Sequence, residues 1–333
     1  MIRIGVIGYG YWGPNIVRNL RGVDGCQLTT VCDQNPAALK RVTQDHPDVR
    51  VTADSSELLT STELDAIAVV TPVCTHFELA KAALENGKHV FVEKPFTSTT
   101  QQAAELIELA ERKNLRIMVD HTFLFTGAVR KIRQLIDEGV LGDLYYYDST
   151  RVNLGLFQHD VSVVWDLAPH DLSIVDYLIQ EKPEAVVATG EAHLNGLVDV
   201  AFITVYFPRN MIAHINVNWL SPVKVRTTLL GGEKKMVVWN DLEADEKIKI
   251  YDKGAQMSNG QGLYDLLVSY RSGDMWAPRV EQAEALKVEL NYFIECVTKD
   301  QTPLNDGVAG SRVVKLLEAA DRSIRERGRA IEL

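Results

Sequence analysis

The chain has 333 residues, a formal net charge of −10 and 46% hydrophobic residues, which suffices for a buried core and for about two domains of roughly 150 residues each. This acidic balance argues against a nucleic-acid-binding protein, which needs a basic surface. No apolar run approaches the ~20 residues that cross a bilayer, and the N-terminus lacks a signal-peptide pattern, so we expect a cytoplasmic protein without membrane contact. The four cysteines lack the spacing of a disulfide framework or of a metal site, so no bound metal is expected.

Short apolar runs and helix-type segments alternate through the first third of the chain. The predicted strands are residues 2–7, 28–32, 49–51, 65–70, 89–92 and 116–119, and the predicted helices are residues 36–45, 75–86 and 100–113, with another helix starting at Gly13. Strands that alternate with helices form a parallel sheet with helices on both faces, and an uninterrupted apolar run such as 65–70 suits a sheet covered in this way. We therefore predict a doubly wound α/β domain over residues 1–120.

After residue 120 the pattern changes. Helices are predicted at residues 128–138, 165–179, 283–298 and 308–327, and strands at residues 144–152, 186–190, 201–207, 211–219, 224–231, 235–239 and 248–251. Strands that follow one another at short spacing form an antiparallel sheet. We therefore predict an α+β domain with a large, mostly antiparallel open sheet over residues 121–333. Residues 253–278, which show no periodicity, are expected to form a mobile loop over a cleft or an interface.

Residues 8–13 read G-Y-G-Y-W-G, which places three glycines at the G-x-G-x-x-G spacing between the first strand and the first helix. Gly8 would make the tight turn, Gly10 would let a pyrophosphate approach the backbone, and Gly13 would let the helix pack on the strand. The positive N-terminus of the helix would then face the anion. Ordinary turns also contain such glycines, so the motif depends on its context. The candidate cofactor contacts are Gly8, Tyr9, Gly10, Tyr11, Trp12 and Gly13.

Asp33 supplies that context, because it ends the second predicted strand twenty residues after Gly13. An acidic side chain at this place can accept hydrogen bonds from the ribose diol of an adenosine, whereas it would repel a 2′-phosphate. We therefore expect the first domain to bind NAD(H) rather than NADP(H).

Polar residues also follow the fourth and fifth predicted strands, at the edge where open α/β sheets bind ligands. Lys94 lies between an apolar strand and a proline, so its ammonium group could hold the reacting oxygen of a substrate and stabilise negative charge there. Glu93 could orient the nicotinamide ribose or pair with Lys94. Thr71, Pro72 and His76 would border the cofactor, although a helix-start turn explains these three residues equally well.

Asp166 and His170 are four residues apart in the predicted helix 165–179, so they would share one face and could form a hydrogen bond. The carboxylate would fix the tautomer and orientation of the imidazole, which could then act as a general base toward a hydroxyl group. Pro169 is disfavoured inside a helix beyond the first turn. If the helix begins at Ala168, the pair would meet through loop geometry instead. The alternative is a helix N-cap followed by a buried histidine without a chemical role.

Four segments together resemble the Gfo/Idh/MocA family of oxidoreductases. They are the N-terminal glycine pattern, Thr71-Pro72 with His76, Glu93-Lys94-Pro95, and the sequence W-D-L-A-P-H-D at residues 165–171. The resemblance spans the chain, and the Glu-Lys-Pro tripeptide with a downstream D-x-x-x-H is its specific part. It implies a Rossmann domain followed by a domain whose open sheet serves substrate binding and oligomer contacts, here a homodimer or homotetramer.

The resemblance also implies the reaction, a hydride transfer between NAD and a hydroxyl-bearing carbon of a sugar or polyol, without a metal ion. Lys94, Asp166 and His170 would be the catalytic residues. Segments 9–15, 151–156 and 163–171 resemble the branch that oxidises the 3-hydroxyl of nucleotide-linked N-acetylhexosamines, which serves amino-sugar and polysaccharide biosynthesis. The weaker candidates for substrate contact are His121, Arg151, Asn153 and Asp171.

Three alternatives remain open at this point. An inositol or a free sugar would satisfy Lys94 and His170 equally well. The chain could sense NAD without turnover, since the same folds host non-enzymes, although the retention of Lys94, Asp166 and His170 argues against a pure sensor. A methyltransferase that holds S-adenosylmethionine in its glycine-rich loop fits the antiparallel second domain poorly.

Overall fold

The computed structural model describes residues 1–155, 157–257 and 268–333. The chain divides into two compact units, one made of residues 1–125 and 283–318 and the other of residues 126–282 and 319–333. Helix α8 (Ala285–Thr298) and the first part of α9 (Gly307–Arg325) therefore belong to the first unit, although the chain reaches them only after it has formed the second sheet.

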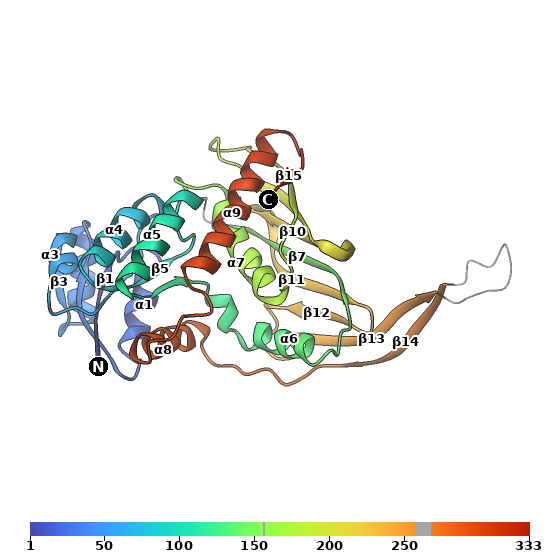
Figure 1. Cartoon of the computed structure of the whole chain (residues 1–333), viewed down its shortest axis with the longest axis horizontal. Coiled ribbons are helices and arrows are strands. Elements are labelled where there is room, and N and C mark those ends of the chain that lie inside the picture. Colours follow the sequence, from blue (N-terminus) through green and yellow to red (C-terminus); the bar gives the residue numbers. More distant parts are fainter. Residues whose placement is uncertain (156, 258–267) are drawn as a thin grey trace. The chain divides into compact units, whose positions relative to one another are not determined.

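The first unit, all of whose residues are described, is built on a six-stranded parallel sheet in the order β3-β2-β1-β4-β5-β6 (Figure 1). Its strands are β1 (Ile2–Ile7), β2 (Cys26–Cys32), β3 (Arg50–Thr52), β4 (Ala66–Val69), β5 (His89–Glu93) and β6 (Ile117–Asp120). The chain moves outward from β1 to β3 and then in the opposite direction from β4 to β6, so right-handed crossovers place helices on both faces. This confirms the predicted doubly wound sheet, and all four residues of β4 are buried.

Helices cover both faces of this sheet. They are α1 (Gly13–Leu20), α2 (Pro36–Asp45), α3 (Ser55–Thr60), α4 (Val73–Glu85), α5 (Thr100–Lys113) and the 3₁₀ helix η1 (Thr122–Phe125). Helix α4 packs against α5, and α1 packs against α8. Phe91 of β5 meets Phe293 of α8 edge to face, with 5.6 Å between the ring centroids. The apolar core of the sheet thus continues into the C-terminal helix.

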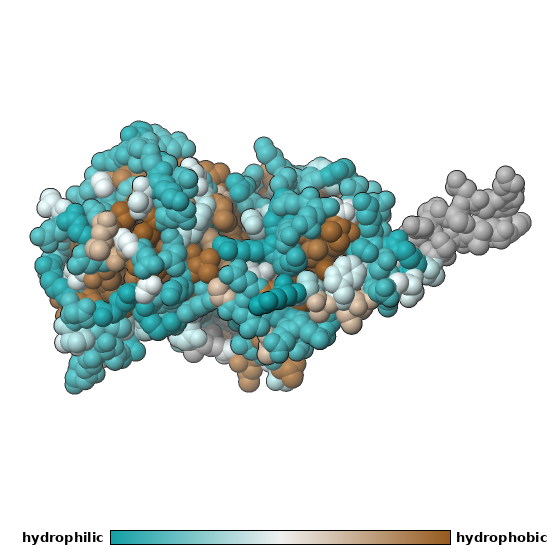
Figure 2. All heavy atoms as spheres, turned by 90° about the horizontal axis from the view of Figure 1, so that it is seen from below, coloured by the Kyte–Doolittle hydropathy of each residue, from teal (hydrophilic) through white to brown (hydrophobic). Residues whose placement is uncertain are grey.

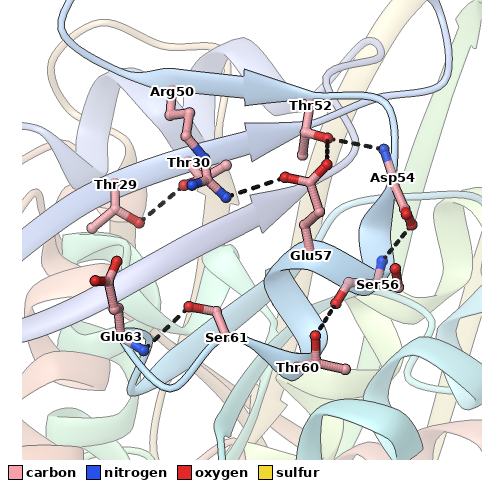
Figure 3. Close-up of polar contacts among 10 residues, drawn as sticks. All are labelled: Thr29, Thr30, Arg50, Thr52, Asp54, Ser56, Glu57, Thr60, Ser61 and Glu63. Carbon is pink, nitrogen blue, oxygen red and sulfur yellow. Dashed lines mark hydrogen bonds and ion pairs between the residues drawn. The ribbon is translucent and has the colours of Figure 1, made fainter.

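The short helix α3 is absent from the predicted elements, and its polar contacts explain why it forms (Figure 3). Asp54 is the N-cap, and its Oδ1 accepts from the Ser56 backbone N–H at 2.8 Å. Glu57 accepts from Thr52 Oγ1 at 2.8 Å and from Arg50 Nη2 at 3.2 Å, which ties the helix to β3. The D-x-x-E spacing of Asp54 and Glu57 is a helix-start signal that hydrophobic periodicity does not detect in so short a segment.

Among the described residues, the second unit is built on a nine-stranded sheet in the order β14-β13-β12-β11-β7-β10-β9-β8-β15. Its strands are β7 (Leu144–Leu154), β8 (Ala185–Glu191), β9 (Val200–Tyr206), β10 (Ile212–Asn218), β11 (Leu220–Gly232), β12 (Met236–Asn240), β13 (Ile248–Met257), β14 (Val268–Trp276) and β15 (Ile331–Glu332). Strands β7 and β10 pair in parallel, whereas the other neighbours pair antiparallel. This confirms the predicted α+β architecture.

Helix α7 (Val163–Leu178) packs on β7, β9 and β10, and α6 (Gly127–Asp137) packs on α7. Helix α7 begins at Val163, so the alternative in which it begins at Ala168 is wrong, and Pro169 lies inside it. A proline there removes one backbone hydrogen bond. The helix is held by tertiary contacts instead, since Leu172 and Ile174 are fully buried and Trp165 Nε1 donates to Asp321 at 2.7 Å.

The predicted loop over residues 253–278 is wrong for most of its length. Strands β13 and β14 form an antiparallel pair from Ile250 opposite Trp276 to Met257 opposite Val268. Residues 258–267 of the predicted loop lie outside the described residues. Residues 272–277, which run from the middle of β14 to one residue past its end, are all exposed. This segment has no buried face, so it lacks the alternation of apolar and polar residues that predicts a half-buried strand.

Apolar side chains fill the interior of each unit, and the surface visible in Figure 2 is mostly hydrophilic with hydrophobic patches between. The largest fully buried side chains include Tyr9 and Phe91 in the first unit and Trp219 and Trp239 in the second. Within the described parts of the chain, no helix is long and apolar enough to cross a membrane.

Two glycines shape the turn between β1 and α1. Gly8 has φ of +104°, and a Cβ atom there would lie 2.0 Å from the backbone oxygen of Val70. A Cβ atom on Gly13 would lie 2.6 Å from the backbone oxygen of Gly8. At Gly10, by contrast, an added Cβ atom would meet nothing within 4 Å. The fold therefore requires glycine at positions 8 and 13 but not at position 10.

We expect Gly8→Ala to lower the free energy of unfolding by about 3 kcal/mol or more, because it combines an unfavourable φ with overlap of a backbone oxygen that cannot move away. Gly10→Ala is the matched control and should change this free energy by less than about 0.5 kcal/mol. Urea unfolding followed by far-ultraviolet circular dichroism measures both variants. Equal stabilities of the two variants would contradict the argument.

Candidate active site

The carboxyl ends of β1 and β4 lie side by side, and the chain leaves these two strands in opposite directions. In open α/β sheets such a point is where ligands bind. The segment Gly8–Gly13 follows β1, Asp33 follows β2, and Thr71 and Pro72 follow β4. The structure thus brings the candidate cofactor residues of the loops after β1, β2 and β4 to one edge of one sheet.

The start of α1 has the features of an anion site. Trp12 is the N-cap residue, and its side chain makes no capping hydrogen bond. The Asn15 N–H donates to Trp12 O at 2.9 Å and Pro14 has no N–H, so Gly13 carries the N–H group of the first turn that a ligand could use, close in sequence to the open space at Gly10. Tyr11 is 85% exposed, whereas Tyr9 is buried at 2% exposure beneath the turn. The indole Nε1 of Trp12 donates to Asp120 Oδ2 at 3.0 Å, which joins this turn to the end of β6.

Asp33 is half-buried and oriented by the backbone. Its Oδ2 accepts from the Tyr9 N–H at 2.6 Å and its Oδ1 from the Asn35 N–H at 2.7 Å. Each carboxylate oxygen has a second lone pair, so the side chain can still accept from a ribose diol. The guanidinium of Arg41 on α2 lies 5.7 Å from the centroid of the Tyr9 ring, and its Nη2 donates to Tyr9 O at 3.3 Å.

Arg41 was not among the predicted site residues. In the sequence, Arg41 is a basic residue on the helix that follows Asp33. Dinucleotide-binding sites that accept the 2′-phosphate of NADP use an arginine near this position. Asp33 and Arg41 therefore favour opposite cofactors, and the choice between NAD and NADP depends on which of them the 2′-position meets.

His76 is fully buried, and both of its ring nitrogens lie against backbone oxygens. Its Nε2 lies 2.7 Å from the backbone oxygen of Thr71, and its Nδ1 lies 2.9 Å from that of Pro95. Burial lowers the pKa of the imidazole, with a small contribution from the charge of Lys94. His76 therefore links the loop after β4 to the loop after β5, so it acts as a positioning residue for Thr71 and Lys94.

Lys94 directly follows β5, and its backbone N–H donates to Glu93 Oε2 at 2.8 Å. The peptide bond between Lys94 and Pro95 is cis. His121, at the end of β6, is 1% exposed, and neither of its ring nitrogens has a hydrogen-bond partner among the described residues. Burial, together with the charge of Lys94, lowers the pKa of His121 to about 3, so this imidazole is neutral at any working pH.

A buried imidazole without a partner is costly unless something else completes its hydrogen bonds. A bound ligand can complete these hydrogen bonds. The positive charge of Lys94 contributes to lowering the pKa of the same imidazole. The pair of Lys94 and His121 is thus the part of the first unit that best fits contact with a reacting molecule.

Asp166 and His170 lie four residues apart on α7 in the second unit. Asp166 Oδ2 accepts from the indole Nε1 of Trp219 at 3.2 Å. Trp219 is 1% exposed, and Phe157 packs edge to face against it. Trp219 therefore orients Asp166, a role that the sequence pattern did not indicate because a tryptophan at a strand end is more often a packing residue.

Arg151 and Asp171, two of the weaker substrate candidates, bind each other. Arg151 Nε donates to Asp171 Oδ2 at 2.5 Å, and the side chains are 6% and 2% exposed. The Tyr147 hydroxyl lies 3.4 Å from the other oxygen of Asp171. This buried pair fastens α7 to β7, and that role accounts for both residues. Asn153, the fourth candidate, is half-buried near the end of β7.

Among residues 1–155, 157–257 and 268–333, no group of His, Cys, Asp and Glu side chains is arranged to hold a metal ion. The four cysteines are free thiols.

Known proteins share both halves of this architecture. The UDP-N-acetylglucosamine 3-dehydrogenase of Acidithiobacillus ferrooxidans is 28% identical over 94% of this chain and 94% of its own length. Its solved structure, GnnA, superposes with a TM-score of 0.81 and 25% identity over 98% of each chain. The scyllo-inositol 2-dehydrogenase (NAD(+)) of Bacillus subtilis is 25% identical over 97% of this chain and 94% of its own length.

Two family profiles also match. Residues 2–121 match the NAD-binding Rossmann fold of an oxidoreductase family, Gfo/Idh/MocA, and residues 129–238 match the C-terminal domain of the same family. These matches cover the parallel sheet of the first unit and most of the strands of the second. The chain therefore belongs to the Gfo/Idh/MocA family of oxidoreductases.

Proposed function

We propose that this protein is an NAD-dependent dehydrogenase that oxidises the 3-hydroxyl of a nucleotide-linked N-acetylhexosamine. The observation that carries the oxidoreductase activity is that Lys94 and the buried His121 directly follow the paired residues Glu93 and Asp120 at the carboxyl edge of the parallel sheet. The substrate rests on the similarity to a UDP-N-acetylglucosamine 3-dehydrogenase over 94% of both chains. An inositol is the competing substrate, because two inositol dehydrogenases are similar to the chain over 97% and 100% of its length.

The residues of the first unit fit NAD. The open space at Gly10 and the uncapped start of α1 would receive the pyrophosphate. Asp33 would accept from the adenosine ribose, and Glu93 and Thr71 would border the nicotinamide half. When bound, the nicotinamide would supply the hydride acceptor for the reaction. Because NAD and sugar nucleotides are cytoplasmic metabolites and the cysteines are free thiols, the proposal includes a cytoplasmic location.

The chain's own residues would handle the proton and the charge. His170 would take the proton of the substrate hydroxyl, and Asp166, oriented by Trp219, would hold the imidazole in the required tautomer. Lys94 would stabilise the negative charge that grows on the oxygen as the hydride leaves the carbon. His121 would complete its hydrogen bonds with the same ligand. In the reductive direction His170 would return the proton.

The open face of the second sheet supports a homodimer or homotetramer. Along β9, β10 and β7 the residues toward α7 are buried, whereas alternate residues point to the other face. The strand register aligns a row of large side chains across that face, namely Tyr206, Ile212, Tyr146, Met236, Tyr251 and Met275. Tyr206 is 42% and Met275 51% exposed. An apolar row of this kind fits a second copy of the same sheet better than it fits water.

The cofactor preference is tested at Asp33. We expect wild-type protein to bind NAD more tightly than NADP, and Asp33→Ala to weaken NAD binding about tenfold or more while NADP binding stays equal or improves, since the ribose loses its acceptor and the 2′-phosphate loses a repulsive charge. Calorimetric titration gives the dissociation constants. Asp24→Ala, an exposed carboxylate before β2, is the control. A wild-type protein that prefers NADP would overturn the assignment.

The catalytic set is tested by removing the proposed base and the proposed charge. His170→Ala and Lys94→Ala should each lower kcat by about a hundredfold or more and leave NAD affinity nearly unchanged, because both side chains would act on the substrate rather than on the cofactor. Stopped-flow and steady-state absorbance of reduced nicotinamide measure the rates. Lys40→Ala, an exposed lysine on α2, should behave as wild type. Near-normal turnover in both variants would remove these residues from the mechanism.

The substrate is tested with a panel of UDP-N-acetylglucosamine, other sugar nucleotides, myo-inositol, scyllo-inositol and glucose, each with NAD at one concentration. We expect NAD reduction with the nucleotide-linked N-acetylhexosamine at a kcat/KM at least about a hundredfold above that for inositol, and a 3-keto product by mass spectrometry and NMR. Reduction of NAD with inositol or glucose, and none with any sugar nucleotide, would instead establish the competing activity.

A further inference from the structure

Three carboxyl groups converge beside Lys94, and the proposed mechanism uses only one of them. Glu93 and Asp120 are the last residues of β5 and β6, and they are direct cross-strand partners in the register of the sheet. Neighbouring parallel strands lie about 4.8 Å apart, so two acidic side chains at such positions are forced together. We call Glu93, Asp120 and Glu289 of α8 the acidic trio.

Glu289 reaches the trio from a distant part of the sequence. It is fully buried, and its Oε1 accepts from Asn305 Nδ2 at 3.0 Å. Asn305 Nδ2 also donates to the backbone oxygen of Val119 at 2.6 Å, one residue before Asp120. Asn305 thus holds Glu289 at the end of β6. Burial is the largest cause of the raised pKa of Glu289, and the negative charge of Asp120 is the next.

The three carboxyl groups differ in their hydrogen-bond donors. Asp120 accepts from Trp12 Nε1 at 3.0 Å and from the hydroxyl of Thr122. Glu93 has the backbone N–H of Lys94 and lies within the field of its ammonium group. Glu289 Oε2 has no donor in the described part of the chain. A proton on that oxygen would turn it into a donor and would satisfy it.

If all three carboxyl groups of the acidic trio were ionised, their negative charges would repel one another, and little positive charge would offset that repulsion. The ammonium group of Lys94 partly offsets the negative charge at Glu93, and His121 on the same edge is neutral. Burial and the charge of Asp120 raise the pKa of both Glu93 and Glu289 well above the ordinary value. Buried carboxyl pairs at hydrogen-bond distance typically share one proton for this reason.

We propose that the acidic trio holds a shared proton, carried mainly by Glu289, and that it releases this proton to solvent when the positively charged ring of an oxidised nicotinamide binds at the carboxyl ends of β5 and β6. This inference rests on the proposed cofactor. The O–H bond of one carboxyl group breaks, the proton passes to the buffer, and the negative charge left behind faces the positive ring. The reduced ring is neutral and leaves the proton in place.

The consequence is a difference between the two cofactor forms in their response to pH. Binding that releases one proton tightens by at most tenfold per pH unit. Over the pH range in which the free protein still holds this proton, we expect the dissociation constant of NAD⁺ to fall by up to tenfold per pH unit, whereas that of NADH changes less than about twofold. The trio would thereby favour the oxidised cofactor as pH rises.

The first experiment needs no ligand. Infrared spectroscopy of the free protein at pH 7 should show the carbonyl stretch of a buried protonated carboxyl group, and Glu289→Gln should remove most of that band. Glu295→Gln, on the exposed face of the same helix, is the control and should leave the band unchanged. Absence of the band in the wild type would overturn the shared proton.

The second experiment counts protons. Titration calorimetry of the wild type with NAD⁺ in two buffers of different ionisation enthalpy should show net proton release above pH 7, titration with NADH should show much less, and Glu289→Gln should abolish the difference. Equal proton counts for NAD⁺ and NADH would overturn the response to charge. A protein that binds no NAD at all would overturn the proposed function as well, whereas the infrared result would still decide whether the trio holds a proton.

Thermal unfolding separates this role from a structural one. A group with a raised pKa in the folded state stabilises the fold at low pH and loses that contribution as pH rises through the raised value. Glu289→Gln keeps the acceptor for Asn305 but cannot lose a proton, so its melting temperature should rise relative to that of the wild type as pH increases from about 6 to about 9. A variant that is less stable by the same amount at both values would identify Glu289 as a packing residue and overturn the proposal.

Discussion

The contact of the Gly8 backbone with Val70 O is the constraint on which the first unit depends, because it brings the ends of β1 and β4 together where the chain turns away from both. A side chain at Gly8 would lie 2.0 Å from that oxygen, and one at Gly13 would lie 2.6 Å from Gly8 O. Three layers of backbone are therefore stacked without side chains between them. The start of α1, where the N-cap residue Trp12 makes no side-chain cap, lies at this edge of the sheet.

The sequence predicts the part of the fold that repeats a local pattern. The boundaries of α2 and α5 agree with the predicted ones at both ends, because Asn35 and Thr99 cap these helices with their side chains and amphipathic spacing follows. Strand β14 was not predicted, since a strand exposed on both faces has no alternation. The return of α8 to the first unit has no local signal either, because it depends on contacts such as Phe91 with Phe293 that lie some two hundred residues apart.

The candidate site divides in the same way. Gly8, Asp33, Lys94 and His170 were found because each belongs to a short motif with a known chemical reason. Arg41, Trp219 and Glu289 were missed, since each acts through a partner that is remote in sequence, namely Tyr9, Asp166 and Asn305. Arg151 and Asp171 were named as weaker substrate candidates from their places in the sequence, and the fold pairs their charges between β7 and α7. Residue type suggests a chemistry, but burial and partners decide whether it is free to act.

The charges around Lys94 are arranged asymmetrically, and this arrangement gives the lysine its role. Two imidazoles, His76 and His121, are kept neutral by burial, so they add no positive charge beside the ammonium group. Glu93 accepts from the backbone N–H of Lys94, and the pKa of Glu93 is raised by the charge of Asp120, which also raises the pKa of Glu289. Lys94 is consequently a single cation between neutral donors and an acidic group that can change its charge by one proton. In the proposed mechanism, neutral imidazoles beside Lys94 leave its charge undivided by a neighbouring imidazolium when it meets the negative charge on a substrate oxygen.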